Sequence, residues 1–126
     1  RILEIAPGFG RITQFLSILA GELVVVDLNP TCIEATKTKL GNHVSGYFVN
    51  DGKSLSDIKD DSQDLVFSYD SFVHMHANVT EEYIKEAKGA DLRVFVVDGQ
   101  IVRFFASQQS DDCGRAGLAM LVSHVS

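Results

Sequence analysis

Short apolar runs alternate with amphipathic segments along the first half of the chain. Three runs are rich in β-branched or aromatic residues, as buried strands are, and they span residues 1–6, 23–27 and 44–49. Apolar residues at helical spacing predict a helix over residues 12–19. A second helix is predicted over residues 31–40, because Asn29 and Pro30 are typical of a helix start.

The second half continues this pattern less regularly. Further apolar runs predict strands over residues 64–69, 92–97, 101–105 and 120–125. A polar stretch at residues 53–62 fits a short helix or a loop, and Thr80 with acidic residues at 81–82 opens another helix. Asp98 and Gly99 predict a hairpin where a helical crossover is due. The order of elements predicts an α/β fold in one domain, residues 1–126, with a doubly wound, mostly parallel, Rossmann-like sheet and helices on both faces.

The composition is that of an ordinary globular domain and limits the possible partners. Acidic residues outnumber basic ones by 17 to 11, for a net charge of −6, which argues against a nucleic-acid backbone as partner. No apolar run approaches the ~20 residues of a membrane helix, so no membrane contact is expected. With only two cysteines and no leader-like segment, we expect free thiols and a cytoplasmic location. The chain starts at Arg1, already within a predicted strand, so we expect it to be part of a longer protein.

Residues with ligand-binding chemistry stand at the ends of the predicted strands, the edge where open α/β sheets bind ligands. Gly8 and Gly10 allow a tight turn and the close approach of a ligand, although a plain strand-to-helix turn also uses glycine. Asp27 can accept hydrogen bonds from both hydroxyls of a ribose, or else cap a helix. Asp51 can accept from an amino group such as that of adenine, or else close an Asx turn. Residues 68–76 add polar and titratable groups after the fourth strand.

A dinucleotide-binding oxidoreductase is one interpretation of this layout. Its fingerprint has three glycines, as Gly-x-Gly-x-x-Gly, and this chain has Gly8, Gly10 and then Thr13 in place of the third. Thr13 therefore counts against NAD(P) as the cofactor. Glu4 lies just ahead of the turn and gives the spacing Glu-x-Ala-x-Gly-x-Gly.

The segment from Ile2 to Arg11, Ile-Leu-Glu-Ile-Ala-Pro-Gly-Phe-Gly-Arg, strongly resembles motif I of the class I S-adenosylmethionine (SAM)-dependent methyltransferases. Three later segments resemble the ribose, adenine-side and strand-four motifs of the same family, in order: residues 24–29, 48–52 and 64–71. Four ordered motifs are more specific than any one. The resemblance covers about residues 1–87. It implies a Rossmann-like fold, SAM as the cofactor, and 1–87 as the cofactor-binding part of the domain.

The resemblance also implies a role for each matched position. The residues that would bind the cofactor are Glu4, Ala6, Gly8, Gly10, Asp27, Leu28, Asn50, Asp51, Gly52, Ser68 and Tyr69. Glu4 and the backbone of residues 6–10 would face the methionine part, and residues 68–70 would line the sulfonium end. Ala6 stands where many family members have glycine, and its extra methyl group is expected to be tolerated.

By the same resemblance, the second and third motifs would bind the nucleoside half of the cofactor. Asp27 would hold the ribose, with Leu28 against the adenine. Asp51 would meet the adenine amino group, with Asn50 and Gly52 beside it.

Methyl transfer to oxygen or nitrogen sometimes needs a general base, and the segment after the fourth strand supplies candidates. We predict His74 and Asp70 as catalytic residues, with His76 as a further candidate base. A cap or a packed histidine is the alternative for either histidine. We expect no metal site, because no Cys or Glu stands at a supporting spacing.

The function that we predict is SAM-dependent transfer of a methyl group to an oxygen or nitrogen atom of a small-molecule acceptor. The alternatives are an NAD(P)-binding Rossmann oxidoreductase and a non-catalytic, methyltransferase-like binding module. The module finds support in the tail, which departs from the family. Residues 87–91 replace a longer helix and turn before the fifth strand, and the run at 120–125 would be the sixth strand, with a seventh still ahead.

Overall fold

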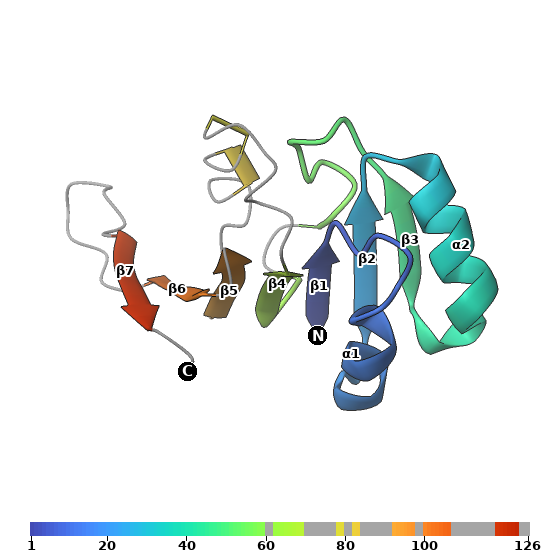
Figure 1. Cartoon of the computed structure of the whole chain (residues 1–126), viewed down its shortest axis with the longest axis horizontal. Coiled ribbons are helices and arrows are strands. Elements are labelled where there is room, and N and C mark those ends of the chain that lie inside the picture. Colours follow the sequence, from blue (N-terminus) through green and yellow to red (C-terminus); the bar gives the residue numbers. More distant parts are fainter. Residues whose placement is uncertain are drawn as a thin grey trace.

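The computed structural model describes residues 1–59, 62–69, 78–79, 82–83, 92–97, 100–106 and 118–123, the last three ranges by their backbone. Within them, one sheet has the strand order β3-β2-β1-β4-β5-β6-β7 (Figure 1). Its strands are β1 (Ile2–Ile5), β2 (Leu23–Asp27), β3 (Gly46–Val49), β4 (Leu65–Tyr69), β5 (Leu92–Val97), β6 (Gln100–Ala106) and β7 (Leu118–Ser123). Every predicted strand is present, with bounds that differ by up to two residues.

The strand directions confirm the predicted fold class. Strands β1 to β5 run parallel, and β6 is antiparallel to both of its neighbours. Val97 lies opposite Gln100, as the predicted hairpin requires. One expectation was wrong, because the strand at 118–123 is the seventh along the chain and not the sixth. The apolar run at 100–106 pairs with β5 and β7 along its length, so it is a full strand.

Two α-helices connect the first three strands: α1 (Thr13–Leu19) and α2 (Pro30–Leu40), the latter followed by the 3₁₀ turn η1 (Gly41–His43). At the start of α2, Asn29 Oδ1 accepts from the Thr31 N–H at 3.0 Å, which satisfies one of the free donors of the first turn. The helix ends at Gly41, whose φ of 49° is left-handed and costs glycine little. Both predicted helices are confirmed to within one residue.

Apolar side chains cover both faces of the sheet. On one face they come from β2, α1, α2 and the segment after α2: Leu16, Leu23, Val25, Ile33 and Val44. On the other face they come from β1, β2, β4 and later segments: Leu3, Ile5, Val26, Leu55, Val66 and Tyr83. Consecutive residues of β2 thus point into opposite layers, as the pleat requires. Tyr83 belongs to a helical stretch of backbone, so helical residues lie against both faces, as predicted.

Helix α1 buries only part of its apolar surface. Leu16 packs into the core, whereas Phe15, Ile18 and Leu19 are 59%, 80% and 78% exposed. We call these three side chains the α1 outer face. Among the residues that the structure describes, no helix is both long and apolar enough to cross a membrane.

Candidate functional site

The chain turns sharply after β1, over residues 6–10. Ala6, Gly8 and Gly10 all have positive φ angles, of 59°, 58° and 82°. The two glycines adopt this conformation freely, whereas the Cβ of an alanine makes it strained by roughly 1–2 kcal/mol. Ala6 stands where many related motifs have glycine, and it therefore adds backbone strain. The sequence predicted only the cost of one extra methyl group and not this strain.

Helix α2 holds the far side of this turn. The Thr36 hydroxyl is fully buried and donates to Gly8 O at 2.9 Å. A Cβ at Gly10 would lie 3.3 Å from Thr36 Cγ2, so a side chain there would press against α2. A Cβ at Gly8 would meet no described atom within 4 Å. A ligand can therefore approach Gly8 on the side where a side chain would stand, whereas Thr36 occupies that side of Gly10.

Asp27, the last residue of β2, lies between this turn and the start of α2. Its Oδ2 accepts from the Gly8 N–H at 3.2 Å, and its Oδ1 accepts from the Asn29 N–H at 2.9 Å. The carboxylate is 9% exposed. Each of its oxygens has a further lone pair, so it can still accept from a ligand hydroxyl. The helix-start role and the ribose role are thus compatible, and the ribose role stays a prediction.

Glu4 brings a second carboxyl group to the same place. Its side chain is 2% exposed, and Oε2 has no hydrogen-bond partner among the described residues. Burial raises the pKa of Glu4 from 4.5 to about 7, the Thr13 hydroxyl works against that rise, and the charge of Asp27 adds to it. The hydroxyl of Thr13 is itself fully buried and lies close enough to the Glu4 carboxyl to lower its pKa. The Glu4 carboxyl and the Thr13 hydroxyl thus lie buried together behind the glycine turn.

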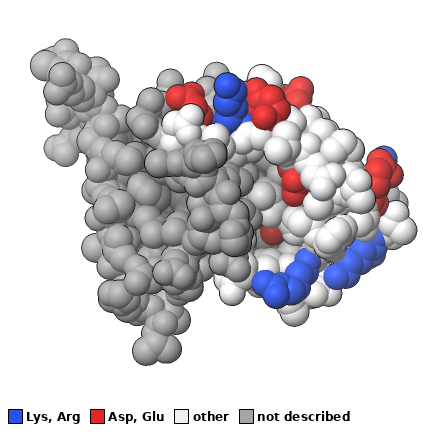
Figure 2. Space-filling model, turned by 45° about the horizontal axis from the view of Figure 1, so that its top comes forward, with Lys and Arg blue, Asp and Glu red and all other residues white. Residues whose placement is uncertain are grey.

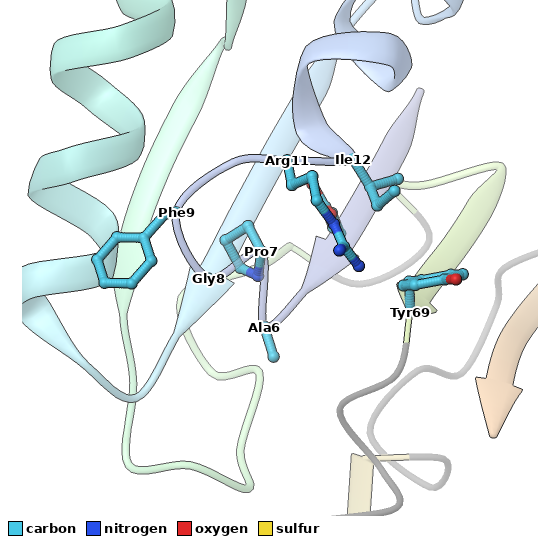
Figure 3. A pocket seen from close by; sticks show the side chains of 8 residues that line it. Ala6, Pro7, Gly8, Phe9, Arg11, Ile12 and Tyr69 are labelled. Carbon is cyan, nitrogen blue, oxygen red and sulfur yellow. The ribbon is translucent and has the colours of Figure 1, made fainter. Parts of the chain in front are cut away.

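A cavity of about 420 Å³ opens in front of the turn (Figure 3). It is lined by Glu4, Ala6, Pro7, Gly8, Phe9, Arg11, Ile12 and Tyr69. Arg11 reaches across it toward β4, with its guanidinium 5.8 Å from the centre of the Tyr69 ring, within the range of a cation–π contact. Four of the predicted binding residues therefore share one cavity, and Arg11 is a lining residue that the sequence reasoning missed.

The turn after β3 carries the predicted adenine-side residues. Asp51 Oδ1 accepts from the Lys53 and Ser54 N–H groups at 2.9 and 2.7 Å, and these bonds hold the pKa of Asp51 below its ordinary value. The Asx turn predicted as the alternative is therefore present. A Cβ at Gly52 would lie 3.2 Å from Leu28 Cδ2, so the exposed Leu28 side chain covers Gly52. Contact of these residues with adenine stays a prediction.

Asn50 holds this turn from inside. Its Oδ1 accepts from the Gly52 N–H at 3.0 Å, and its Nδ2 donates to Ser54 O at 2.8 Å and to Tyr83 Oη at 3.0 Å. Both amide hydrogens are thus used within the protein. From the sequence, Tyr83 was predicted only to lie on the apolar face of a helix. Its contact with Asn50 spans 33 positions, so no local sequence pattern predicted that contact.

The end of β4 is only partly described. The Ser68 hydroxyl is buried and donates to Ile5 O at 2.9 Å, so it ties β4 to the end of β1. The candidate bases His74, Asp70 and His76 lie outside the described residues, and their roles stay predictions. No group of three or more metal-ligating side chains occurs among the residues that were placed.

Cys32 is a free thiol in α2, as expected. Burial, with the nearby charge of Asp27, raises its pKa. A raised pKa disfavours the reactive thiolate form of this cysteine. In the view of Figure 2, acidic and basic side chains are interspersed over the described part of the surface. That part of the face has no large area of a single charge.

Comparison with solved structures finds similar folds at low sequence identity. The PH0226 protein of Pyrococcus horikoshii OT3 matches with 24% identity and a TM-score of 0.62, over 75% of this chain and 48% of that one. A complex named DhpI-SAM-HEP matches with 25% identity and a TM-score of 0.59, over 76% and 45%. A SAM-dependent methyltransferase of Leishmania major matches with 17% identity and a TM-score of 0.66, over 75% and 41%. The chain thus spans less than half the length of these proteins.

Sequence comparison places the chain more directly. A search of curated proteins found no match. A family model described as a methyltransferase domain matches residues 2–90, which include the turn after β1, Asp27, the turn after β3 and the end of β4. The match covers well over half of the chain and the parts that form the cavity. By this match, the chain belongs to the methyltransferase domain family.

Proposed function

We propose that this chain binds S-adenosylmethionine and supports transfer of its methyl group to an oxygen or nitrogen atom of a small-molecule acceptor. The arrangement around the glycine turn carries the proposal. Asp27 is held at the end of β2 by the Gly8 N–H, 3.2 Å from its Oδ2, and keeps spare acceptor capacity beside the open side of Gly8. The family match and the SAM named in the DhpI-SAM-HEP complex support the same cofactor.

The residues around the cavity fit the charges of this cofactor. SAM carries an ammonium group and a sulfonium, both cationic, and one carboxylate. Glu4 Oε2 is a buried acceptor without a described partner, which suits the ammonium group. Arg11 lines the same cavity and offers donors to the carboxylate. Asp27 would accept from the ribose hydroxyls, and Asp51 would accept from the adenine amino group.

The bound cofactor supplies the activated methyl carbon, and the chain supplies binding and orientation. Alignment of acceptor atom and methyl group is the main contribution that a protein makes to such a displacement. Tyr69 lies at the end of β4 on the cavity wall, where the sulfonium end of the cofactor would lie. His74 and Asp70 remain our candidates for the base that takes the proton of the acceptor.

Isothermal titration of the full-length protein with SAM tests the proposal. Asp27→Ala should weaken binding at least about tenfold, because hydrogen bonds to a charged acceptor are worth about 1.5–3 kcal/mol. Asp64→Ala is the matched control, since Asp64 pairs with Arg1 at the opposite edge of the sheet. Its affinity should equal that of the wild type. Failure of the wild type to bind SAM, or preferential binding of NAD(H), would overturn the proposal.

A non-catalytic binding module is the second candidate, and one observation favours it. Strand β5 turns directly into antiparallel β6, where a doubly wound sheet would have a helical crossover. An altered second half of the sheet affects the region where an acceptor would bind. Methyl transfer from labelled SAM to a metabolite panel separates the two candidates. SAM binding without turnover on any acceptor favours the module.

A further inference from the structure

Tyr83 stands beneath the turn after β3. It is 2% exposed and belongs to the same core cluster as Leu55, which follows that turn. Its hydroxyl is the polar end of an otherwise apolar contact, and it accepts a hydrogen bond from Asn50 Nδ2 at 3.0 Å. A buried phenol of this kind normally has such a partner, because an unpaired hydroxyl would lose its hydrogen bonds to water.

The turn itself fixes the orientation of the Asn50 amide, because Ser54 O can only accept and the Gly52 N–H can only donate. With Nδ2 toward Tyr83 and Ser54 O, Oδ1 faces the Gly52 N–H. A reversed amide would place an oxygen against Ser54 O and would lose the bond to Gly52. The Tyr83 hydroxyl takes the remaining hydrogen of Asn50 Nδ2 and ties the oriented amide to the core.

Asp51 occupies the middle of the turn that Asn50 organises. Its Oδ1 is held by the Lys53 and Ser54 N–H groups, and Ser54 O is also bound to Asn50. The direction of the Asp51 carboxylate is thus set by the same backbone that Asn50 fixes. Gly52, covered by Leu28, completes the surface beside it.

We propose that Tyr83 is a positioning residue which, through Asn50, aims Asp51 so that the site selects a nucleobase with an amino group over one with a carbonyl group. The proposal rests on the proposed function above, in which Asp51 meets the adenine of the cofactor. A carboxylate attracts the amino hydrogens of adenine and repels the carbonyl oxygen that replaces them in hypoxanthine. Selectivity of this kind needs a fixed carboxylate, because a mobile one can turn away from the carbonyl.

The charges around Tyr83 agree with a neutral acceptor. Burial raises the pKa of the Tyr83 phenol, the bond from Asn50 works against that rise, and the charges of Asp27 and Asp51 add to it. The phenol therefore stays protonated and uncharged at neutral pH. The Tyr83 oxygen can accept from Asn50 while adding no negative charge beside the two carboxylates.

The test compares S-adenosylhomocysteine with S-inosylhomocysteine by isothermal titration of the full-length protein. We expect the wild type to prefer the adenosyl ligand by about tenfold or more, the effect of one charge-assisted hydrogen bond. Tyr83→Phe should remove most of that preference, chiefly by lowering the affinity for the adenosyl ligand. Tyr47→Phe is the matched control, since its hydroxyl donates to Gly41 O at the other end of β3. It should keep the wild-type preference.

Asn50→Ala provides a second route if Tyr83→Phe does not fold, because it cuts the same link and leaves the Tyr83 ring in the core. It should lower the preference at least as much, because it also removes the bonds to Gly52 and Ser54 O, and the double variant should lower it no further than Asn50→Ala alone. Equal weakening of both ligands by Tyr83→Phe, or a wild type without preference, would overturn the inference alone. A wild type that binds neither ligand would overturn the proposed function itself.

Discussion

Two single residues at this site, Ala6 and Glu4, each destabilise the folded state, and the rest of the fold compensates for this. Ala6 keeps a left-handed backbone with φ of 59°, and its N–H donates to Val26 O at 2.8 Å. Glu4 keeps a carboxyl group in the core with one oxygen lacking a described partner. Strained backbone and unsatisfied buried groups concentrate where proteins bind ligands. Both residues line the same cavity, which favours a ligand-binding role for it.

Ala6→Gly should stabilise the protein or leave it unchanged. Relief of the positive φ is worth roughly 1–2 kcal/mol, and the greater freedom of glycine in the unfolded chain removes about 0.4–1 kcal/mol of that gain. Ala35→Gly in α2 is the matched control and should lose about 1 kcal/mol, because helical backbone favours alanine. Urea denaturation measures both. If Ala6→Gly lowers the free energy of unfolding as much as Ala35→Gly does, then the backbone at Ala6 is not strained.

Glu4 should make stability depend on pH. Its pKa is about 7 in the folded protein and 4.5 by reference. A raised pKa means that its contribution is fully present below pH 4.5 and is lost as the pH rises through 7. Glu4→Gln should therefore be more stable than the wild type at pH 8, by an amount on the order of 2–3 kcal/mol beyond any difference at pH 4.5.

Urea denaturation at both pH values measures this effect. Glu22→Gln is the control, since Glu22 is exposed at the surface. Its difference from the wild type should be the same at both pH values. If Glu4→Gln behaves like this control, then Glu4 is not desolvated in the folded protein.

At the scale of elements, the two helices contribute unequally to the core. Helix α2 packs Ile33 and Thr36 against the sheet and holds the glycine turn through Thr36. Helix α1 is shorter, has no side-chain cap because Ile12 precedes it, and leaves its outer face exposed. The site therefore depends on α2 for its shape, and α1 adds mainly Leu16 and Thr13.

A matched pair of isoleucines tests this difference. Ile18 on α1 is 80% exposed, and Ile33 on α2 is 4% exposed. Ile18→Ala should change the free energy of unfolding by less than about 0.5 kcal/mol, whereas Ile33→Ala should cost about 2–5 kcal/mol. Chemical denaturation measures both. A large loss from Ile18→Ala would show that the α1 outer face is buried in solution.

At the scale of the whole molecule, one continuous sheet places the strand ends side by side. Strand β1 lies between β2 and β4, so Glu4, Asp27 and Tyr69 reach the same edge from three neighbouring strands. Apolar layers on both faces bury the centre of the sheet. Strand β3 is the last strand on its side. Stability should therefore be greatest at β1 and β2 and lower at β3.

Amide hydrogen exchange tests this order. The N–H groups of β1 and β2 should exchange slowest, because they open only when the core opens. Those of β3 should exchange faster, and those of residues 51–59, which lie outside helices and strands, faster still. SAM binding should slow exchange most at residues 6–10 and 50–54 if the site is as proposed. Equal protection of β3 and β1 would contradict the order.

Much of the fold follows from local pattern. The runs at 23–27 and 92–97 match their strands to the residue, since apolar, β-branched segments have few alternatives to a buried strand. All four predicted strands of the second half are present, but the run at 120–125 was numbered sixth by resemblance to the family and its strand is the seventh along the chain. The glycine turn and Asp27 were found from motif spacing. Arg11 and Tyr83 were not, because nothing local distinguishes them.

The sequence by itself determined the alternation of strands and helices, the place of the turns, and the types of residue at the strand ends. These depend on backbone preferences and apolar spacing, which act within a few residues. Tertiary structure alone decided that Glu4 is desolvated, that Ala6 is strained, and that Tyr83 meets Asn50 across 33 positions. Such properties depend on which distant groups surround a side chain, and packing alone decides that.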